Sequence, residues 1–294
     1  MRSPPATGSA PFRRPSSPAW SGGGLGNFAP GEWTDDTSQA VTIAQVAARG
    51  GDLRTPEVLD AIAQGFMRWY ADDPADIGNQ TAAVFSRVSR TPSGAEMAAA
   101  ARDLHHLHGR SAGNGSLMRT GPVVLAYLDD PAGLVEAAMV ISALTHYQDY
   151  AQEACALWSL MIRHTVVTGE FPTYDDVAPW MPNMQAWRDR LREAEDREPS
   201  VFIENAWSVG ALQAAWSSIV HTPVPEAEPA RHFVDSLTTA IRIGHDTDTV
   251  AAIAGALLGA RWGMSAVPER WLRILHGWPG IDAAELERIA RAAI

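Results

Sequence analysis

The sequence predicts an all-α fold, a single domain of about ten or more helices. Beyond Thr37, apolar residues recur at steps of three and four positions along most of the chain, which is the spacing of one helix face. Segments that alternate apolar and polar residues, as strands do, are nearly absent, and the isolated apolar triplet at residues 201–203 is too short to build a sheet. We therefore expect a compact helical domain without a sheet core.

Composition and charge exclude several classes of protein. The 294 residues are 46% hydrophobic, enough for a sizeable core, and 23 Lys and Arg against 34 Asp and Glu give a net charge of −11. That sign argues against non-specific binding to nucleic acid or to anionic lipid. The single cysteine, Cys155, permits no intramolecular disulfide. No apolar run reaches the roughly 18–20 residues that span a bilayer, so we expect a cytoplasmic, monomeric protein without a membrane partner.

The first 21 residues differ from the rest of the chain. They are dominated by Pro, Ser and Gly and carry no periodic apolar face, a composition typical of disorder. Arg13-Arg14 resembles the start of a twin-arginine export signal, but Gly22-Gly23-Gly24 follows instead of an apolar stretch. We expect residues 1–21 to form a disordered tail and residues 22–294 to form the helical domain.

Apolar stripes and end signals place the helices of this domain. Thr55, Pro56 and Glu57 provide an N-cap, a proline at the first helical position and an acid in the first turn. An apolar stripe follows at residues 58, 62, 66 and 69. Similar stretches predict helices at residues 133–145, 150–167, 184–195, 207–220, 231–243 and 249–262. Three glycines stand where helices should end: Gly169, Gly244 and Gly263.

Two acidic segments stand out from this helical background. Residues 31–37 (GEWTDDT) and residues 244–249 (GHDTDT) each gather Asp carboxylates and Thr hydroxyls just ahead of a helix. Neighbouring carboxylates repel unless protons or cations neutralise them, and oxygen ligands favour hard ions such as Mg²⁺, Mn²⁺ or Ca²⁺ over Zn²⁺. Four aspartates would balance two divalent cations. The alternative is that each segment only caps its helix, because Asp and Thr are common at N-caps.

A third segment, residues 113–122 (GNGSLMRTGP), is a glycine-rich turn that leads into a helix. Such a turn can offer backbone N–H groups to a phosphate, and Arg119 would add positive charge. It is not a Walker motif, because no Gly-Lys-Ser/Thr follows at the required spacing. The alternative is a plain loop.

Taken together and in this order, these segments resemble the ADP-ribosylglycohydrolase family, which includes the dinitrogenase-reductase-activating glycohydrolases. The resemblance covers about residues 22–275. The matching segments are residues 33–37 (WTDDT), 76–81 (DIGNQT), 113–119 (GNGSLMR), 145–146 (TH) and 244–249 (GHDTDT), the last followed by 251–256 (AAIAGA).

The resemblance implies a compact, orthogonal multi-helix fold with a dinuclear Mg²⁺ or Mn²⁺ centre. It implies six metal ligands, matched position by position: Thr34, Asp35, Asp36, Asp246, Asp248 and Thr249. Three residues would line the distal-ribose and acceptor side: Asp76, Gly78 and Asn79. The pyrophosphate would be held by a loop and one histidine: Asn114, Gly115, Ser116, Met118, Arg119 and His146.

The sequence departs from the family pattern at two places. Members usually begin with a helix that carries a Gly-Asp-Ala-like element, and here the Pro/Gly/Ser-rich tail takes its place, which puts one wall of the site in doubt. His245 stands where glycine is common in the family. Its side chain would either contact the substrate or cap the following helix, and the cap is the favoured interpretation.

The resemblance implies a metal-dependent hydrolase that attacks C1″ of ADP-ribose with an activated water and releases it from modified protein, with arginine as the first linkage to test. Asp35 or Asp246 would accept the proton of that water, and the sequence favours neither. The partners would be an ADP-ribosylated protein and the ADP-ribose product. The alternatives are a non-catalytic ADP-ribose-binding or structural relative, and a hydrolase of another linkage: serine, a nucleic-acid end or a free metabolite.

Overall fold

The computed structural model describes residues 22–24 and 26–294, and the predicted tail at residues 1–21 lies outside this range. Within it, helices dominate and the strands form one two-stranded hairpin. The prediction of a single compact all-α domain is therefore confirmed. Among these residues, no helix combines the length and the apolar character needed to cross a bilayer.

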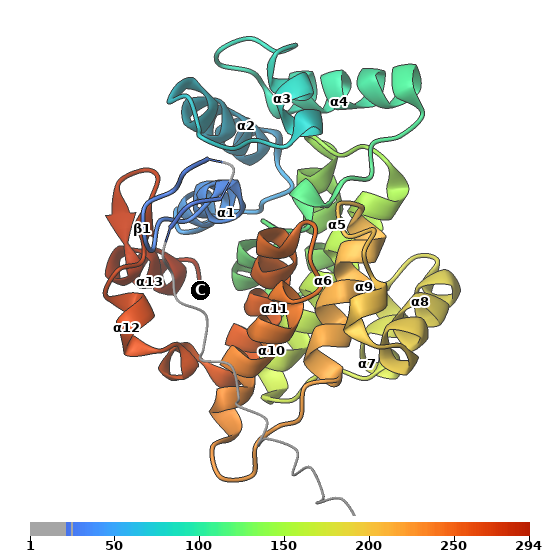
Figure 1. Ribbon diagram of the computed structural model, residues 1–294. Helices are drawn as coiled ribbons and strands as arrows, with labels where there is room; N and C mark the ends of the chain where they lie inside the picture. The colour runs from blue at the N-terminus through green and yellow to red at the C-terminus, as the bar shows by residue number, and fades with distance from the viewer. Residues whose placement is uncertain (1–21, 25) are drawn as a thin grey trace, which may run out of the picture.

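The first four helices form the upper part of the molecule in Figure 1. They are α1 (Asp35–Ala47), α2 (Pro56–Ala71), α3 (Asn79–Phe85) and α4 (Gly94–His108). α2 packs against both α1 and α4, and α3 packs against α4. Thr55 and Pro56 occupy the N-cap and first position of α2, as predicted. The predicted stripe of α2 packs into the core, where Ile62, Phe66 and Trp69 are buried.

Five longer helices pack around the centre of the domain (Figure 1). They are α5 (Pro131–Ala143), α6 (Asp149–Thr168), α9 (Ser208–Val220), α10 (His232–Ile241) and α11 (Thr247–Trp262). α6 contacts α5, α9 and α11. Trp158 at its middle has no exposed surface, and its Nε1 donates to the carbonyl of Ile253 in α11 at 3.0 Å. The predicted bounds of all five helices agree with the structure within two residues.

Glycines end two of these helices as predicted. Gly169 follows α6 with φ 74° and Gly263 follows α11 with φ 71°, a region of backbone space that glycine enters without a Cβ clash. The remaining helices lie at the edges of the domain: α7 (Tyr174–Val177), α8 (Met184–Asp196), α12 (Glu269–Leu272) and α13 (Ala283–Ala292). The predicted bounds of α8 also agree within one residue.

A short hairpin near the C-terminus supports the segment that leads into α1. β1 (His276–Gly277) and β2 (Ile281–Asp282) pair antiparallel, and strands this short leave no alternating pattern to predict. The backbone N–H of Trp33 donates to the carbonyl of His276 at 3.0 Å, and the indole Nε1 of Trp33 donates to the carbonyl of Trp278 at 3.2 Å. A Cβ on Gly277 would collide with this indole, so a glycine allows the close contact.

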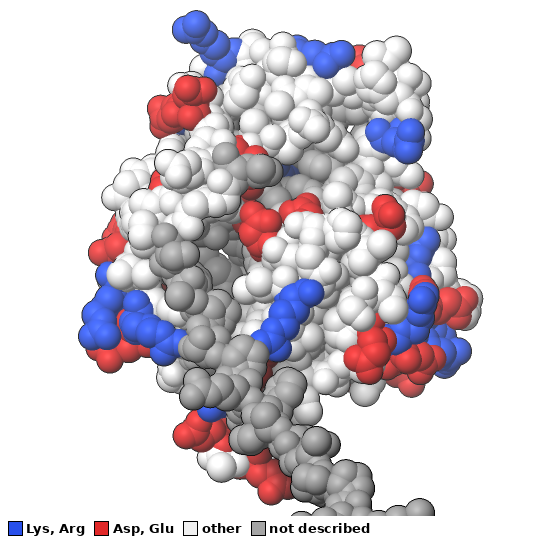
Figure 2. Space-filling model, viewed as in Figure 1, with Lys and Arg blue, Asp and Glu red and all other residues white. Residues whose placement is uncertain are grey.

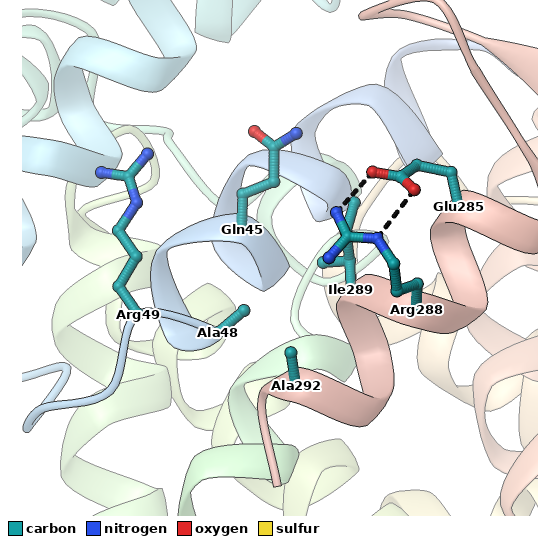
Figure 3. Close-up of a pocket in the computed structure, with 7 residues that line it drawn as sticks. All are labelled: Gln45, Ala48, Arg49, Glu285, Arg288, Ile289 and Ala292. Atoms are coloured by element: carbon teal, nitrogen blue, oxygen red, sulfur yellow. Dashed lines mark hydrogen bonds and ion pairs between the residues drawn. The ribbon is translucent and has the colours of Figure 1, made fainter.

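α13 packs beside the C-terminal half of α1 and leaves a groove of about 340 Å³ between them (Figure 3). Gln45 of α1 and Arg49, two residues beyond its end, line the groove, and Ile289 of α13 is buried. Arg288 forms an ion pair of 2.6 Å with Glu285 on the same helix. The carboxylate in this groove is therefore neutralised by a neighbour, unlike those at the other end of α1.

Candidate active site

A cleft of about 990 Å³ opens where the N-termini of α1, α3 and α11 meet the glycine-rich turn and His146. Figure 2 shows acidic side chains gathered in a hollow over the start of α11. The cleft is lined by most of the residues that the sequence singled out: Thr34, Asp35, Asp76, Gly78, Asn79, Asn114, Gly115, Met118, His146, His245, Asp246, Asp248 and Thr249. Five segments that are far apart in the sequence therefore meet in one cavity.

The acidic segments occupy helix starts but do not act as side-chain caps. Thr34 is the N-cap of α1 and Asp246 the N-cap of α11, yet neither side chain accepts a hydrogen bond from its helix backbone. By contrast, Asp130 and Asp282 cap α5 and α13 through contacts of 2.9 and 3.0 Å. Thr34 instead donates its hydroxyl to Asp36 at 2.6 Å. These contacts do not support the interpretation of the two segments as plain caps.

The carboxylates of the cleft have unusual pKa values. Burial, reinforced by the charges of Asp76, Asp248 and Asp246, raises the pKa of Asp35 to about 7. Burial and the charge of Asp35 raise the pKa of Asp36 well above its ordinary value, and burial also raises the pKa of Asp246. No Lys or Arg in the described residues forms an ion pair with these three groups. The cleft therefore favours protons or cations.

The donor set fits hard divalent cations. Asp carboxylates and Thr hydroxyls supply only oxygen, the ligand type of Mg²⁺ and Mn²⁺. The Oδ1 atom of Asp36 is buried without a hydrogen-bond partner, which is costly unless another group satisfies it. As they stand in the described residues, no three His, Cys, Asp or Glu side chains converge closely enough to hold an ion. The oxygen-rich lining and the unpaired Oδ1 of Asp36 are therefore the observations that favour a divalent cation here.

Two asparagines hold Asp246 in place. The amide of Asn114 donates to Asp246 Oδ2 at 2.7 Å and to the carbonyl of Asn205 at 2.8 Å. Asn205 has no exposed surface; its Oδ1 accepts the backbone N–H of Asp246 at 3.1 Å, and its Nδ2 donates to Gly244 at 3.0 Å. The sequence analysis missed Asn205, because an isolated Asn in a loop before a helix carries no distinguishing pattern. It ties the start of α9 to the start of α11.

His146 forms part of the cleft wall beside the glycine-rich turn. A Cβ on Gly115 would lie 3.2 Å from its Nε2, and one on Gly113 would lie 3.4 Å from the same atom. The absence of side chains at these two positions lets the ring lie against the turn. Burial and the nearby charge of Arg119 lower the pKa of His146 to about 3, so the ring is neutral at physiological pH.

Two of the expected substrate-binding side chains do not reach the cleft. Arg119 is buried: its Nη1 donates to Gln39 Oε1, its Nη2 donates to Thr145 Oγ1 at 2.7 Å, and its guanidinium lies 4.3 Å from the ring centre of Phe66. The Ser116 hydroxyl accepts from Ser142 at 2.8 Å inside the core. Direct contact of either side chain with a pyrophosphate is therefore not supported, because both have turned toward the interior.

Asp36 also lies behind the cleft surface, with an exposed fraction of 3%. Its carboxylate accepts a hydrogen bond from Thr34, which lines the cleft. His245 lines the cleft. The cap interpretation of His245 is wrong, because the N-cap of α11 is Asp246. The backbone of His245 has φ 64°, the left-handed region that favours glycine.

The segment that precedes α1 lines one side of the cleft. Gly22, Gly23, Gly24 and Phe28 line the cleft, and the chain reverses there through a bridge between Gly23 and Phe28. These residues therefore form part of the cleft wall, and the hairpin of β1 and β2 holds the residues before α1 in place through Trp33.

Comparisons with known proteins agree with this arrangement. The model of the ADP-ribosylglycohydrolase family matches residues 3–294. The chain is 26% identical to the ADP-ribosylarginine hydrolase Tri1 of Pseudomonas putida over 85% of its length, and 27% identical to the ADP-ribosyl-[dinitrogen reductase] glycohydrolase of Rhodospirillum rubrum, also over 85%. It spans 64% of the first relative and 76% of the second.

Two further similarities extend this result. The human ADP-ribosylhydrolase ARH3 is 25% identical over 87% of this chain and 78% of its own length. A solved structure described as an ADP-ribosylglycohydrolase-related protein complex superimposes with a TM-score of 0.68 at 26% identity, covering 96% of this chain and 88% of its own. Because the family model matches nearly the whole sequence, this chain belongs to the ADP-ribosylglycohydrolase family.

Proposed function

We propose that this protein is a metal-dependent hydrolase that releases ADP-ribose from modified protein side chains. The arginine N-glycosidic linkage is the first linkage that we propose it cleaves. The observation that carries the proposal is the meeting of carboxylates from α1 and α11 in one cleft, without basic partners in the described residues. Two of the similar proteins act, by their names, on ADP-ribosylarginine and on ADP-ribosylated dinitrogen reductase, which favours removal of ADP-ribose from protein.

Six residues at the starts of α1 and α11 would hold two Mg²⁺ or Mn²⁺ ions: Thr34, Asp35, Asp36, Asp246, Asp248 and Thr249. When bound, such ions orient substrate oxygens and lower the pKa of a water. The unpaired Oδ1 of Asp36 and the raised pKa of Asp35 support this assignment. The hydroxyl of Thr34 would then turn from Asp36 toward an ion.

Asp35 and Asp246 are the two candidates for the general base that accepts a proton from the attacking water. Asp35 lines the cleft among other carboxylates, and in the absence of metal its pKa is raised to about 7, so it readily takes up a proton or a cation. Asp246 lines the cleft, and Asn114 holds its Oδ2 at 2.7 Å, so the carboxylate is fixed in position at the site of the proposed ions. As the bond at C1″ breaks, positive charge develops on the ribose ring, and the carboxylates of the cleft would stabilise it.

The shape and charge of the cleft suit the parts of an ADP-ribosylated arginine. The guanidinium acceptor is cationic and would enter on the side of Asp76, Gly78 and Asn79, which line the cleft. Gly115 and Ser116 lie in a short 3₁₀ helix at residues 114–116. Their backbone N–H groups have no hydrogen-bond acceptor among the described residues. They would face the pyrophosphate together with His146, so Ser116 would contribute its backbone.

The test is release of free ADP-ribose from protein that carries arginine-linked ADP-ribose, with serine-linked substrate in parallel. Each reaction is run with Mg²⁺, with Mn²⁺ and with EDTA. We expect release from the arginine linkage that requires metal and stops in EDTA. Release from serine alone would contradict the proposed linkage and keep the hydrolase. No release from either substrate, with ADP-ribose binding seen by calorimetry, would instead establish a binding protein.

A further inference from the structure

The guanidinium of Arg119 is a buried cation that lies between α1 and the residues next to His146. Arg119 has an exposed fraction of 1% and forms no ion pair with any described residue. Its guanidinium donates to Gln39 on α1 and to the hydroxyl of Thr145, and it stacks on Phe66. A buried charge held only by neutral groups is unfavourable for stability alone, so its contacts point to a role in positioning its neighbours.

The hydroxyl of Thr145 has two neighbours, and one of them fixes the direction of its proton. Arg119 Nη2 lies 2.7 Å from Thr145 Oγ1, and a guanidinium can only donate. The hydroxyl oxygen is therefore the acceptor of this contact. Its own hydrogen remains for the second neighbour, His146 Nδ1, at 2.8 Å. The hydroxyl oxygen could accept a second hydrogen bond from Nδ1, but the hydrogen of Thr145 would then have no acceptor, because Thr145 Oγ1 has no third partner among the described residues. Both groups are satisfied only when Nδ1 of His146 accepts this hydrogen.

The consequence appears on the other side of the imidazole ring. A neutral ring whose Nδ1 accepts carries its proton on Nε2. Nε2 faces the turn at Gly113 and Gly115, which lines the cleft. His146 Nε2 has no hydrogen-bond partner in the described part of the chain. The ring therefore presents an N–H donor to the cleft, beside the backbone N–H groups of Gly115 and Ser116.

We propose that Arg119 and Thr145 are positioning residues that lock His146 in its Nε2–H tautomer, so that it donates a hydrogen bond to a phosphate oxygen of ADP-ribose. The ligand assignment rests on the proposed function, whereas the tautomer rests only on the contacts within the chain. In the opposite tautomer, a lone pair of Nε2 would face the phosphate oxygen and repel it. A cation that never enters the cleft thus determines whether the cleft attracts or repels its ligand at this point.

We call the hydrogen-bonded series Arg119–Thr145–His146 the relay. The tautomer of His146 can be measured in the wild-type protein, without any substitution in the relay. Two-bond ¹⁵N–¹H correlation spectra distinguish the two tautomers and the charged ring, and a His146→Gln variant identifies the signal among the nine histidines. We expect the Nε2–H tautomer at pH 7, retained at pH 5. A spectrum with the proton on Nδ1, or with a charged ring at pH 7, would overturn the proposal.

Substitutions at Thr145 then test the effect on binding. Thr145→Val removes the hydroxyl at nearly constant volume, and Thr145→Ser retains it. We expect Thr145→Val to weaken ADP-ribose binding about tenfold and to mix the tautomers, with Thr145→Ser within about threefold of wild type. Thr165→Val is the matched control, because Thr165 is equally buried and its hydroxyl, among the described residues, bonds only to the carbonyl of Met161 in the same helix.

Calorimetry with ADP-ribose in Mg²⁺ separates this proposal from the proposed function. If the wild type binds no ADP-ribose, the proposed function fails, and the tautomer spectrum alone decides whether the relay exists. If the wild type binds and Thr145→Val binds equally well with an unchanged spectrum, the relay is wrong and the proposed function stands. Loss of binding in Thr145→Ser and Thr165→Val as well would indicate a general packing effect and would also contradict the relay.

Discussion

Asp35 begins α1 and Asp52 follows its end by five residues, and the two carboxylates have opposite electrostatic surroundings. Asp52 accepts hydrogen bonds from Arg54 at 2.8 Å and from the hydroxyl of Tyr127 at 2.6 Å, and these contacts hold the pKa of its carboxyl well below the ordinary value. Asp35 is mostly buried beside three other carboxylates, which together with burial raise its pKa to about 7. The same residue type is thus neutralised at one position and left unsatisfied at the other.

The difference between the two carboxylates distinguishes a group that stabilises the fold from a group that serves a site. A carboxylate with an Arg and a Tyr partner stabilises the fold as it stands, whereas buried carboxylates without a cation destabilise it. Such a group persists where the charge is used, which is why perturbed pKa values gather at functional sites. The acidic cleft is therefore expected to depend on added cations, and the Asp52 network is not.

Substitution of the cleft carboxylate should give the largest effect. We expect Asp35→Asn to lower the rate of ADP-ribose release at least about 10³-fold, because it removes a proposed metal ligand and base. The same change should raise the free energy of unfolding of the metal-free protein by about 2–4 kcal/mol at pH 7.5, since it removes a buried charge. Steady-state kinetics and urea unfolding measure the two effects. A less active but destabilised variant would indicate that Asp35 is structural.

The pH dependence of the free energy of unfolding should differ between the wild type and the Asp35→Asn variant. Because the pKa of Asp35 is raised in the folded state to about 7 from an ordinary 3.8, its contribution is present at low pH and is lost as pH rises between these values. We expect the metal-free wild type to lose on the order of 2–4 kcal/mol relative to Asp35→Asn from pH 4 to pH 8. Comparison with the variant removes the opposite contribution of buried histidines such as His146, whose pKa is lowered.

Urea unfolding at several pH values measures this difference, and excess Mg²⁺ provides the control. If the carboxylates bind the ion, the difference should shrink or reverse when Mg²⁺ is present. A difference that stays constant from pH 4 to pH 8 without metal would show that Asp35 is not perturbed in the folded state.

The paired carboxylate should respond in the opposite way. We expect Asp52→Asn to leave the rate of ADP-ribose release unchanged and to lower the free energy of unfolding by about 1 kcal/mol, a modest value because the pair is partly exposed to solvent. Added Mg²⁺ should not alter this loss. A large loss of activity in Asp52→Asn would break the proposed separation between the two regions.

Backbone strain in the cleft should give the smallest effect. His245 has φ 64°, and we expect His245→Gly to raise the free energy of unfolding by about 0.5 kcal/mol, because glycine adopts this conformation without a Cβ clash. The neighbouring Gly244 has φ 87°, so Gly244→Ala should destabilise by more than this amount. Thermal unfolding of both variants measures the two changes in stability. Stabilisation by Gly244→Ala would contradict backbone strain at this turn.

The fold was largely predictable because helix periodicity and glycine stops are local. Residues 56, 169 and 263 marked helix boundaries that the structure confirms. The hairpin at residues 276–282 was missed, because two-residue strands have no period and are held by contacts with Trp33. That contact joins segments from opposite ends of the chain, which no local pattern can reveal.

The candidate site was predictable in its residues and less so in their orientation. Spacing and resemblance named the residues of the cleft, but the burial of Arg119 and the inward turn of Ser116 depend on core packing around Phe66 and Ser142. Asn205 was missed for the same reason, since its role arises only from its contacts with Gly244 and Asp246. The motif indicates that a residue belongs to the site, and the packing decides which atoms it offers.

The most direct test of the central claim is the stoichiometry and affinity of Mn²⁺ binding, measured by electron paramagnetic resonance for the wild type, Asp35→Asn and Asp246→Asn. The account predicts two ions per wild-type chain and a loss of affinity of about tenfold or more in each variant, because α1 and α11 contribute to one centre. The Asp52→Asn variant should bind as the wild type does. Unchanged Mn²⁺ affinity in either Asp35→Asn or Asp246→Asn would contradict a shared metal site.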